Sequence, residues 1–252
     1  SHDDAWHHLV SATYKYASGP WDLSVMLFSQ FADEHKVKER VNRTGVYKLT
    51  DDYRNTFDGG SWISARRKTG IHTITAGLDF KLGIQDEESI YRTSTDHLMY
   101  EGKLIFGGLF IQDEIAFSNF PLRISAGLRA DWARFYDGSL DIENPTSNTG
   151  FIQSENFIYT DNSWSRLSPK VALLYDFSSK YSAYLSFGSG FNPPKLDDLV
   201  RSGKISKGFK LANPELEPEW VNTYEAGATL KPVKGLTIAL AGYYTTGDDF
   251  QY

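Results

Sequence analysis

The chain contains no cysteine, and this absence removes several kinds of chemistry at once. A disulfide framework, a zinc–thiolate site and a cysteine nucleophile are all excluded. No run of about 18 or more apolar residues occurs, so the sequence does not predict a transmembrane helix. The first residues, Ser1-His2-Asp3-Asp4, lack the basic start and the apolar stretch of a signal peptide. Because the chain also does not begin with Met, we interpret it as a mature or internal piece.

Signatures of catalysis and of several ligand classes are also missing. None of the six histidines has a metal-binding spacing with a carboxylate on one face. Glycine loops that cradle phosphates are absent, and so are nucleic-acid-binding signatures. The paired acids Asp51-Asp52 and Asp197-Asp198 are expected to be solvated. The sequence therefore predicts no enzyme, no cofactor, no metal site and no nucleic-acid partner.

Aromatic residues, in contrast, are abundant and make up 15% of the chain. This excess favours strands and interfacial girdles over helices. The mean hydropathy of −0.41, taken alone, indicates a soluble protein. A membrane barrel strand, however, places a polar residue in the lumen after each lipid-facing one, so its mean hydropathy stays low. Hydropathy therefore does not exclude a membrane.

Alternation of apolar and polar residues is the main structural signal. In 122–132, for example, Leu122, Leu128 and Trp132 fall on one face. The charged residues Arg129 and Asp131 fall on the other face. We predict ten strands, at 5–17, 20–32, 57–69, 71–84, 99–118, 121–137, 164–177, 180–189, 217–231 and 235–248.

Short and long connections alternate along the whole chain. The tight turns are at 18–20, 68–70, 118–121, 178–180 and 232–235, and the long loops run over 33–56, 85–98, 137–163 and 189–216. An outer-membrane barrel has short periplasmic turns and long extracellular loops, whereas compact soluble domains favour short connections throughout. The pattern therefore favours a membrane barrel, with these turns periplasmic and these loops extracellular.

One charge falls on the predicted lipid-facing side of its strand. Asp113 shares a face with Ile111 and Ile115. A charge on this face is costly at the bilayer midplane and cheap near the rim. We therefore expect Asp113 to lie close to the turn at 118–121.

Two short boxes near the C-terminus carry a family resemblance. Residues 187–196, Phe-Gly-Ser-Gly-Phe-Asn-Pro-Pro-Lys-Leu, resemble the "GFRAP-x-L" box of TonB-dependent outer-membrane receptors. Residues 213–219, Asn-Pro-Glu-Leu-Glu-Pro-Glu, resemble the "NPxLKPE" box, and 224–227 is similar to the "YElG" strand. The matching residues, with a structural role implied, are Gly190, Phe191, Pro193, Pro194, Asn213, Pro214, Pro218, Glu219, Tyr224, Glu225 and Gly227. The resemblance covers 99–252 well. In 1–98 it extends only to the alternation and spacing of the predicted strands.

The resemblance implies an all-β fold, an antiparallel up-and-down transmembrane β-barrel in the outer membrane of a Gram-negative bacterium. About ten strands are fewer than the 22 of a plugged barrel. We therefore expect 1–252 to be part of one barrel domain, with the N-terminal plug domain absent and the C-terminal closing strands missing. The implied partners are outer-membrane lipid and lipopolysaccharide, TonB through the missing plug domain, and a ferric siderophore or similar small ligand.

The chain departs from the family pattern in two places. Asn192 replaces the Arg of the first box. The haem receptors of the family carry a His between the two boxes, and 192–213 contains none, which argues against haem.

The predicted loops contain the candidate ligand-binding residues. Loops 33–56 and 189–216 are basic within a chain of net charge −6, and loop 137–163 combines aromatic and amide side chains. A local positive field recruits an anionic ligand, and aromatic side chains stack on a flat one. Contact with lipopolysaccharide phosphates, ordinary solvation and packing of loops on their neighbours are the alternative roles. The candidates are Lys36, Arg40, Arg43, Phe151, Phe157, Tyr159, Arg201, Lys204 and Lys207.

We interpret the chain as a fragment of a TonB-dependent receptor whose intact form binds and imports a scarce nutrient, with a ferric siderophore favoured. Two alternatives make different structural predictions. A complete ten-stranded outer-membrane barrel with protease activity requires 5–17 and 235–248 to pair and close the barrel. A soluble β-sandwich binding module requires a buried apolar core between two sheets.

Overall fold

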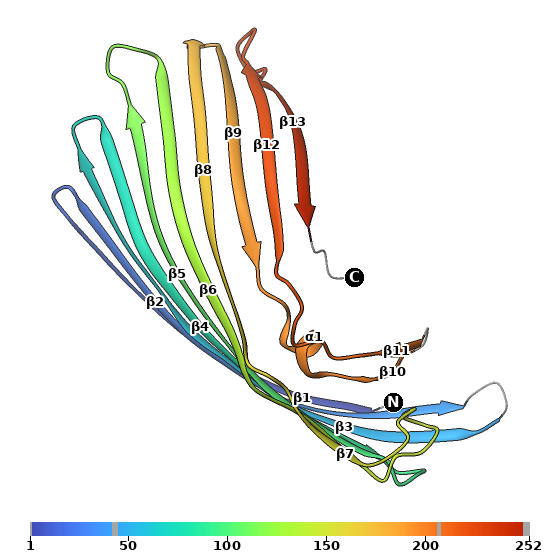
Figure 1. The fold of residues 1–252 in the computed structure, drawn as a ribbon. Coiled ribbons are helices and arrows are strands. Elements are labelled where there is room, and N and C mark those ends of the chain that lie inside the picture. Colours follow the sequence, from blue (N-terminus) through green and yellow to red (C-terminus); the bar gives the residue numbers. More distant parts are fainter. Residues whose placement is uncertain (1, 42–44, 206–207, 249–252) are drawn as a thin grey trace.

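The computed structural model describes residues 2–41, 45–205 and 208–248. Figure 1 shows one long, strongly curved sheet, with a small helix and a short hairpin on its concave side. The strands of the sheet are β1 (His2–Ser18), β2 (Trp21–Val41), β3 (Tyr47–Thr69), β4 (His72–Tyr91), β5 (His97–Ala116), β6 (Leu122–Glu143), β7 (Glu155–Ile158), β8 (Asn162–Ser178), β9 (Tyr181–Asn192), β12 (Glu219–Leu230) and β13 (Ile238–Asp248). The connection from β9 to β12 contains the helix α1 (Leu196–Val200), β10 (Gly203–Ile205) and β11 (Gly208–Lys210).

The sheet follows the order of the chain. Its path is β1-β2-β3-β4-β5-β6-β8-β9-β12-β13, every neighbouring pair is antiparallel, and β7 pairs with β6 off this path. The ten antiparallel up-and-down strands predicted from the alternation are thereby confirmed. Within the described residues β1 and β13 do not pair with each other, so the prediction of a closed ten-stranded barrel is wrong.

The strands are longer than predicted, and the loops are correspondingly shorter. Strand β2 continues to Val41 and β3 begins at Tyr47, so most of 33–56 is a paired hairpin. Strand β4 continues to Tyr91 and β5 begins at His97, which reduces the loop 85–98 to a turn. The physical reason is that backbone pairing does not require apolar side chains. The apolar alternation ends within these strands, whereas the hydrogen-bond ladder continues beyond it.

The convex face carries an apolar surface over the half of the sheet nearest the short turns, which we call the turn end. Leu109, Leu167 and Leu240 are 62%, 61% and 61% exposed there. A soluble sandwich would bury such a face against a second sheet. The described residues form no second layer over it, so the sandwich prediction is wrong. The α1 helix has five residues, and no helix among the described residues has the length and apolarity needed to cross a membrane.

Asp113 lies on this convex face close to the turn end, as the sequence predicts. It lies three residues before Ala116, the last residue of β5. Its carboxylate also has a partner that the sequence did not reveal, because Oδ2 lies 2.6 Å from Nδ1 of His72 on the neighbouring strand. The charge is therefore both near the rim and paired.

A small core lies at the opposite end of the sheet, which we call the loop end. Leu199 and Val200 of α1 are fully buried against Leu98, Tyr100 and Phe135 on the concave face of β5 and β6. Residues 193–216, which we call the strap, are described apart from 206–207 and cross the concave face here (Figure 1). The core therefore fixes the strap to the inner wall.

A β-bulge shapes the wall beneath the strap. The register of β5 and β6 shifts between Glu101 and Lys103, and Asp137 opposite has a φ of 52°. Gly138 follows, and a Cβ on it would lie 2.1 Å from the ring of the fully buried Phe135. The glycine is therefore required for the close approach of that ring.

Replacing Gly138 with Ala is expected to destabilise the folded sheet by about 1–3 kcal/mol, because the buried Phe135 ring has no room to move. The measurement is the temperature at which the folded band disappears from the gel after samples have been warmed to a series of temperatures before electrophoresis. Gly188→Ala is the matched control, since a Cβ at Gly188 meets nothing within 4 Å. Equal melting temperatures for the two variants would contradict the prediction.

Candidate ligand-binding site at the loop end

The two faces of the wall carry opposite charge at the loop end. Successive side chains of a strand point to opposite faces. In β2, Lys36, Lys38 and Arg40 point to the concave face, on which the strap lies, while Asp33 and Glu39 point to the convex face. A segment that reads as mixed charge in the sequence is therefore sorted by strand geometry into a basic and an acidic side.

The neighbouring strands extend this sorting. Lys48 and Arg54 of β3 share the concave face with the basic residues of β2. The acids of the convex face are Asp33, Glu39, Asp51, Asp86, Glu88, Glu101, Asp141 and Glu143. Glu34, Asp52 and Glu87 also face inward and Lys103 faces outward, so the sorting is one of excess: the inner wall of the loop end has more cations than carboxylates, and its outer wall has more carboxylates than cations.

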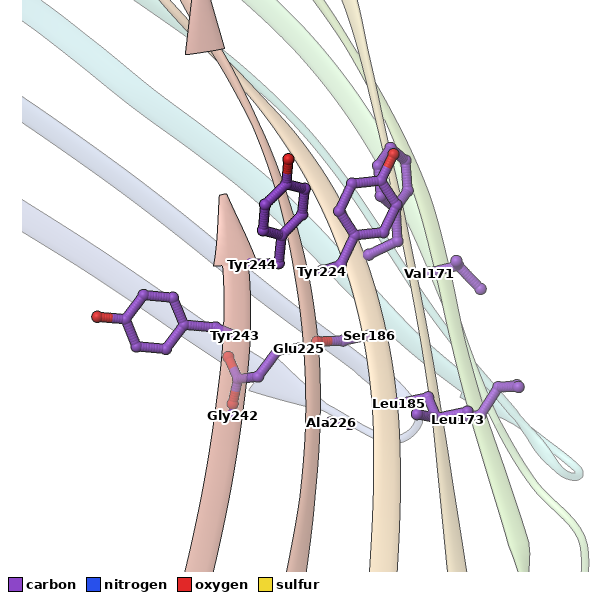
Figure 2. A pocket seen from close by; sticks show the side chains of 11 residues that line it. Val171, Leu173, Leu185, Ser186, Tyr224, Glu225, Ala226, Gly242, Tyr243 and Tyr244 are labelled. Atoms are coloured by element: carbon purple, nitrogen blue, oxygen red, sulfur yellow. The ribbon is translucent and has the colours of Figure 1, made fainter. Parts of the chain in front are cut away.

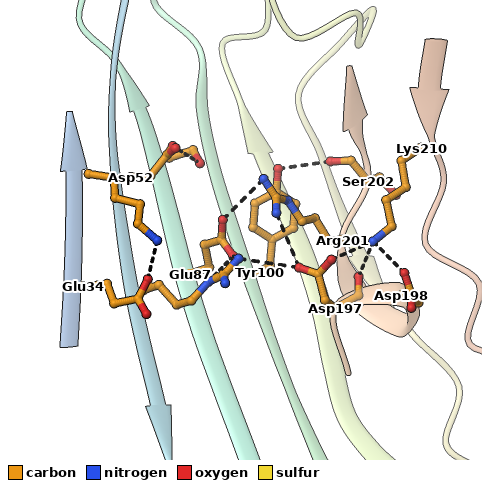
Figure 3. Close-up of polar contacts among 12 residues, drawn as sticks. Glu34, Asp52, Glu87, Tyr100, Asp197, Asp198, Arg201, Ser202 and Lys210 are labelled. Carbon is orange, nitrogen blue, oxygen red and sulfur yellow. Dashed lines mark hydrogen bonds and ion pairs between the residues drawn. The ribbon is translucent and has the colours of Figure 1, made fainter. Parts of the chain in front are cut away.

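An ion-pair network joins the strap to the wall (Figure 3). Glu87 of β4, whose side chain is only 3% exposed, accepts hydrogen bonds of 3.0 and 2.8 Å from Arg54 and lies 3.7 Å from Arg201 of the strap. Asp197 lies 3.5 Å from Arg201 and 2.7 Å from Lys210. The network therefore connects β3, β4, α1 and β11 through alternating charges.

The network also sets the ionisation of its members. Burial alone raises the pKa of Asp197, but the hydrogen bond from Lys210 and the charges of Arg201, Lys210 and Arg54 outweigh it and hold that pKa below its usual range. Burial lowers the pKa of Lys210, and its hydrogen bonds to Asp197 and Asp198 outweigh burial and raise it. Both groups are therefore charged at neutral pH.

Two neutral contacts reinforce the strap. The Tyr100 hydroxyl donates a 3.0 Å hydrogen bond to the carbonyl of Ser202. The Ser202 hydroxyl accepts a 2.8 Å hydrogen bond from the backbone N–H of Ala212. The strap is thus fixed to the wall and also braced internally.

Asp96 anchors the adjacent loop between β6 and β7. It is 1% exposed and accepts hydrogen bonds of 2.5 and 2.6 Å from the hydroxyls of Thr146 and Thr149. Burial raises the pKa of Asp96, but the hydrogen bonds from Ser94, Thr146 and Thr149 outweigh it and lower the pKa. The loop is therefore a fixed wall of the loop end.

A basic pocket of about 290 Å³ opens between the strap and the concave wall. Its cationic lining consists of Lys38, Arg40, Lys48, Arg201 and Lys210. Asp52 is the carboxylate in the lining, 2.5 Å from Lys38. Arg40 makes no ion pair with any described residue. The arrangement is suited to an anionic group that enters from the loop end.

The predicted ligand-binding residues divide into three groups. Arg40 and Arg201 meet in the basic pocket, whereas Lys36 lies on the same face outside its lining and pairs with Glu34 at 2.6 Å. Arg43 and Lys207 lie outside the described residues. Lys204 lies in β10, and its side chain is likewise not among those described.

The aromatic candidates lie away from the basic pocket. Phe151 packs edge-on against Phe209 at a centroid distance of 5.2 Å, and Tyr159 packs on the core with its hydroxyl 3.5 Å from the carbonyl of Val200. Phe157 lies on β7 and is 37% exposed. The structure therefore gives Phe151 and Tyr159 the packing role that the sequence left open as an alternative.

Asp51 and Asp52 are not solvated, which corrects the sequence-based expectation for this pair, whereas Asp197 and Asp198 are partly exposed, with side-chain exposures of 36% and 31%. Asp51 and Asp52 are 9% and 8% exposed. Asp51 accepts a 2.7 Å hydrogen bond from Arg92, and Asp198 lies 2.8 Å from Lys210. Asp51 and Asp52 are adjacent on a strand and face opposite sides, so they pair with different cations, Arg92 and Lys38. Asp197 and Asp198 lie in α1 and both pair with Lys210.

The first family box and the 224–227 segment lie on the paired strands β9 and β12, and the second box leads into β12 at Glu219. Gly190 on β9 is opposite Val221 on β12, and Asn192 donates a 3.0 Å hydrogen bond to Glu219. Strand β9 ends at Asn192, immediately before Pro193-Pro194, as expected from the missing N–H groups of proline. The structural role implied for these residues therefore fits their placement.

The wall also has a hollow of about 600 Å³ between β8, β9, β12 and β13. Figure 2 shows Tyr224 and Tyr244 near one another, with Val171, Leu173 and Leu185 on the neighbouring strands. These side chains belong to the apolar convex face, so this hollow is part of that outer surface. No group of three or more metal-binding side chains occurs in the described part of the chain.

Comparisons with known proteins define the class. Residues 1–252 match the model of the family described as TonB dependent receptor-like, beta-barrel. The chain belongs to this family. The family consists of transporters of the Gram-negative outer membrane, not enzymes, and the chain is accordingly an outer-membrane β-barrel segment. A search of curated proteins returned no match.

Solved structures of receptors and transporters share the fold. The ferric yersiniabactin uptake receptor FyuA from Yersinia pestis has a TM-score of 0.72 at 13% identity, over 97% of this chain and 36% of its own. The copper transporter OprC gives 0.73 at 13% identity, over 98% and 39%. The ferric citrate transporter FecA gives 0.69 at 14% identity, over 96% and 34%. The chain thus spans little more than a third of the length of these proteins, and the similarity establishes the fold alone.

Replacing Glu87 with Gln is expected to loosen the strap by about 1–3 kcal/mol, because Arg54 and Arg201 lose a shared charged acceptor. Loosening should accelerate tryptic cleavage after Arg201 and Lys210, measured by sequencing the fragments over time. Asp137→Asn is the control, since it removes an exposed pair with Lys103. Unchanged cleavage in the Glu87 variant would contradict the role of the network.

His97 provides a pH-dependent prediction. Its Nε2 lies 2.6 Å from Glu88, and its Nδ1 lies 3.0 Å from Glu143. Burial lowers the pKa of His97, but the hydrogen bonds to Glu143 and Glu88 outweigh it and raise the pKa above 6.5. The histidine therefore stabilises the folded state fully below about pH 6.5, and this contribution disappears as the pH rises through the folded pKa. His97→Gln should melt below wild type in acid and equal it in alkali, and a difference independent of pH would refute the assignment.

Proposed function

We propose that this chain is part of the barrel of a receptor that binds and imports an anionic metal chelate, most simply a ferric siderophore. In this proposal the barrel has 22 strands and encloses a plug domain that receives energy through TonB, and residues 1–252 are one part of its wall. The loop end faces the outside of the cell. The acidic outer wall stands beside lipopolysaccharide, and the apolar belt contacts lipid.

The separation of charge across the wall is the observation that supports an anionic cargo. An excess of cations on the inside and an excess of carboxylates on the outside favour an anion in the lumen. An anion that reaches the mouth is therefore attracted toward the basic pocket. Family membership supports ligand uptake in general, and the charge pattern supports a cargo with a negative charge.

The pocket has the size of a subsite and not of a whole siderophore site. A volume of about 290 Å³ lies at the lower limit of ligand pockets. We assign it to one charged end of the cargo, such as a carboxylate. The remaining contacts come from other parts of the lumen.

Charge reversal at Arg40 tests the proposal. In a strain that lacks the gene and is complemented with the intact gene, growth under iron limitation should be restored by at least one member of a panel of ferric chelates that includes ferric citrate. Arg40→Glu is expected to weaken binding of that chelate by about tenfold at low salt, and the effect should shrink at high salt. Binding is measured with the radiolabelled chelate on whole cells.

Lys103→Glu is the matched control. Lys103 is a cation of the same loop end, but it points to the outer wall, where it lies 2.9 Å from Asp137. The control should bind the chelate as wild type does. Failure of every ferric chelate to restore growth would refute iron import, and an equal loss in both variants would refute the inward direction of the field.

A further inference from the structure

The outer surface of the turn end carries an isolated cation, Arg67. Leu109 of the convex face pairs directly with Leu78, and Leu78 pairs with Ile63. Residues that oppose each other in antiparallel strands share a face, and so do residues four apart on one strand. Arg67 lies four residues beyond Ile63 on β3, so its side chain points outward, and it is exposed. It stands two residues before the end of β3 at Thr69, at the edge of the apolar belt.

Arg67 differs from the other basic strand residues of the turn end in its direction and in its lack of a partner. Lys15, Arg66, Lys68 and Arg123 occupy the alternate strand positions, which point to the concave face. Arg67 makes no ion pair with any residue that the structure describes. Strand β3 is flanked by β2 and β4, so its neighbours in the sheet are already present. A cation on the lipid-facing side is tolerated near the rim, where a polar group from outside the protein can reach it.

An aromatic ring holds the Arg67 guanidinium beside the apolar belt. Trp21, the first residue of β2, pairs directly with Arg67, and the guanidinium carbon lies 5.0 Å from the centroid of the indole ring. Rows of aromatic side chains mark the level of the lipid headgroups on membrane barrels. The exposed aromatic residues next to the turns are Tyr14, Tyr16, Trp21, Phe117, Phe120, Phe177 and Tyr181. Arg67 therefore lies at the depth of the headgroups.

His72 supplies a second polar group beside Arg67. Arg67 pairs with Ile74, and His72 lies two residues from Ile74 on the same face, which makes it a diagonal neighbour of Arg67. Its Nδ1 lies 2.6 Å from Oδ2 of Asp113, and its Nε2 makes no hydrogen bond within the described part of the chain. Asp113 lies on the far side of Ile74 and is engaged by His72, so it does not neutralise Arg67.

We propose that Arg67, Trp21 and His72 form a site for the phosphodiester headgroup of an anionic glycerophospholipid. The guanidinium donates to the phosphate oxygens, for which its planar set of donors is suited. Nε2 of His72 binds a second oxygen of the headgroup, and the acyl chains lie on the apolar surface that begins at Ile74. The proposal rests on the proposed function in one respect, the orientation that places the turn end in the periplasmic leaflet, where phospholipid and not lipopolysaccharide is the lipid.

The test uses the fluorescence of Trp21 in the intact receptor, reconstituted in phosphatidylcholine bilayers that contain increasing fractions of brominated phosphatidylglycerol or of brominated phosphatidylcholine. Bromine quenches tryptophan on contact, and subtraction of the same measurement on a Trp21→Phe variant isolates the emission of Trp21. In wild type we expect phosphatidylglycerol to bind beside Trp21 about fivefold more strongly than phosphatidylcholine, the factor that one arginine gains at an anionic lipid surface. Arg67→Gln should remove this preference, and high salt should reduce it in wild type.

Arg66→Gln is the matched control. Arg66 is the adjacent residue of the same strand and carries the same charge, but it points to the concave face. This variant should keep the fivefold preference of wild type. Circular dichroism of both variants should show the strand content of wild type, so that a lost preference is not a loss of folding.

Two results would overturn the proposal: the same preference in wild type and Arg67→Gln, or loss of the preference in Arg66→Gln as well. Two competitors separate the sources of phosphate. Inorganic phosphate should leave the quenching unchanged, and displacement by it would refute a lipid site. Lipopolysaccharide should compete less well than phosphatidylglycerol, and the reverse would refute both the phospholipid and the proposed orientation.

Growth on the ferric chelate separates this proposal from that of metal-chelate import. Arg67→Gln should restore growth as the wild-type gene does, because Arg67 lies on the outer surface. Arg40→Glu should weaken chelate binding and keep the phospholipid preference at Trp21. A loss of the preference in Arg40→Glu would contradict a local site at Arg67.

Discussion

Backbone pairing in lipid is the constraint on which the rest of this structure depends. The bilayer offers no partner for an N–H or C=O group, so strands that cross it must satisfy each other. The chain meets this requirement by laying ten strands side by side in sequence order. The same ladder then continues beyond the apolar belt, to Val41 in β2 and Tyr91 in β4. The backbone pairing that a membrane requires therefore also holds together the part of the sheet that continues beyond the apolar belt.

The extension of the paired strands determines which face of the sheet each charged side chain points to. A charged loop has no fixed inside or outside, whereas a charged strand presents alternate residues to opposite faces. Lys36, Lys38 and Arg40 consequently face one way as a group. The strap then packs on that same face, held by the core at Val200 and by the network around Glu87. Charge sorting and strap anchoring are thus two results of one extended sheet.

The sequence predicted the parts that depend on local pattern. Alternation located the ten strands, and the cost of a lipid-facing charge located Asp113 near the rim. It did not predict the length of the loops, because the apolar pattern ends before the pairing does. The alternation of sign in 33–41 was visible, but it is informative only once that segment is known to be a strand. The position of the strap could not be predicted from the sequence. The residues that hold it on the wall are distant in the chain, and only the curvature of the sheet brings them together.

The distance between these anchors has a consequence for how the protein matures. Tyr100 and Ser202 are separated by 102 positions, and Val200 is buried only against strands that must already be in place. Contacts between such distant segments form late, because the chain between them has to be ordered first. We therefore expect the strap to dock only after β5 and β6 have paired. Until the strap docks, the basic side chains of β2 and β3 on the inner face remain uncovered.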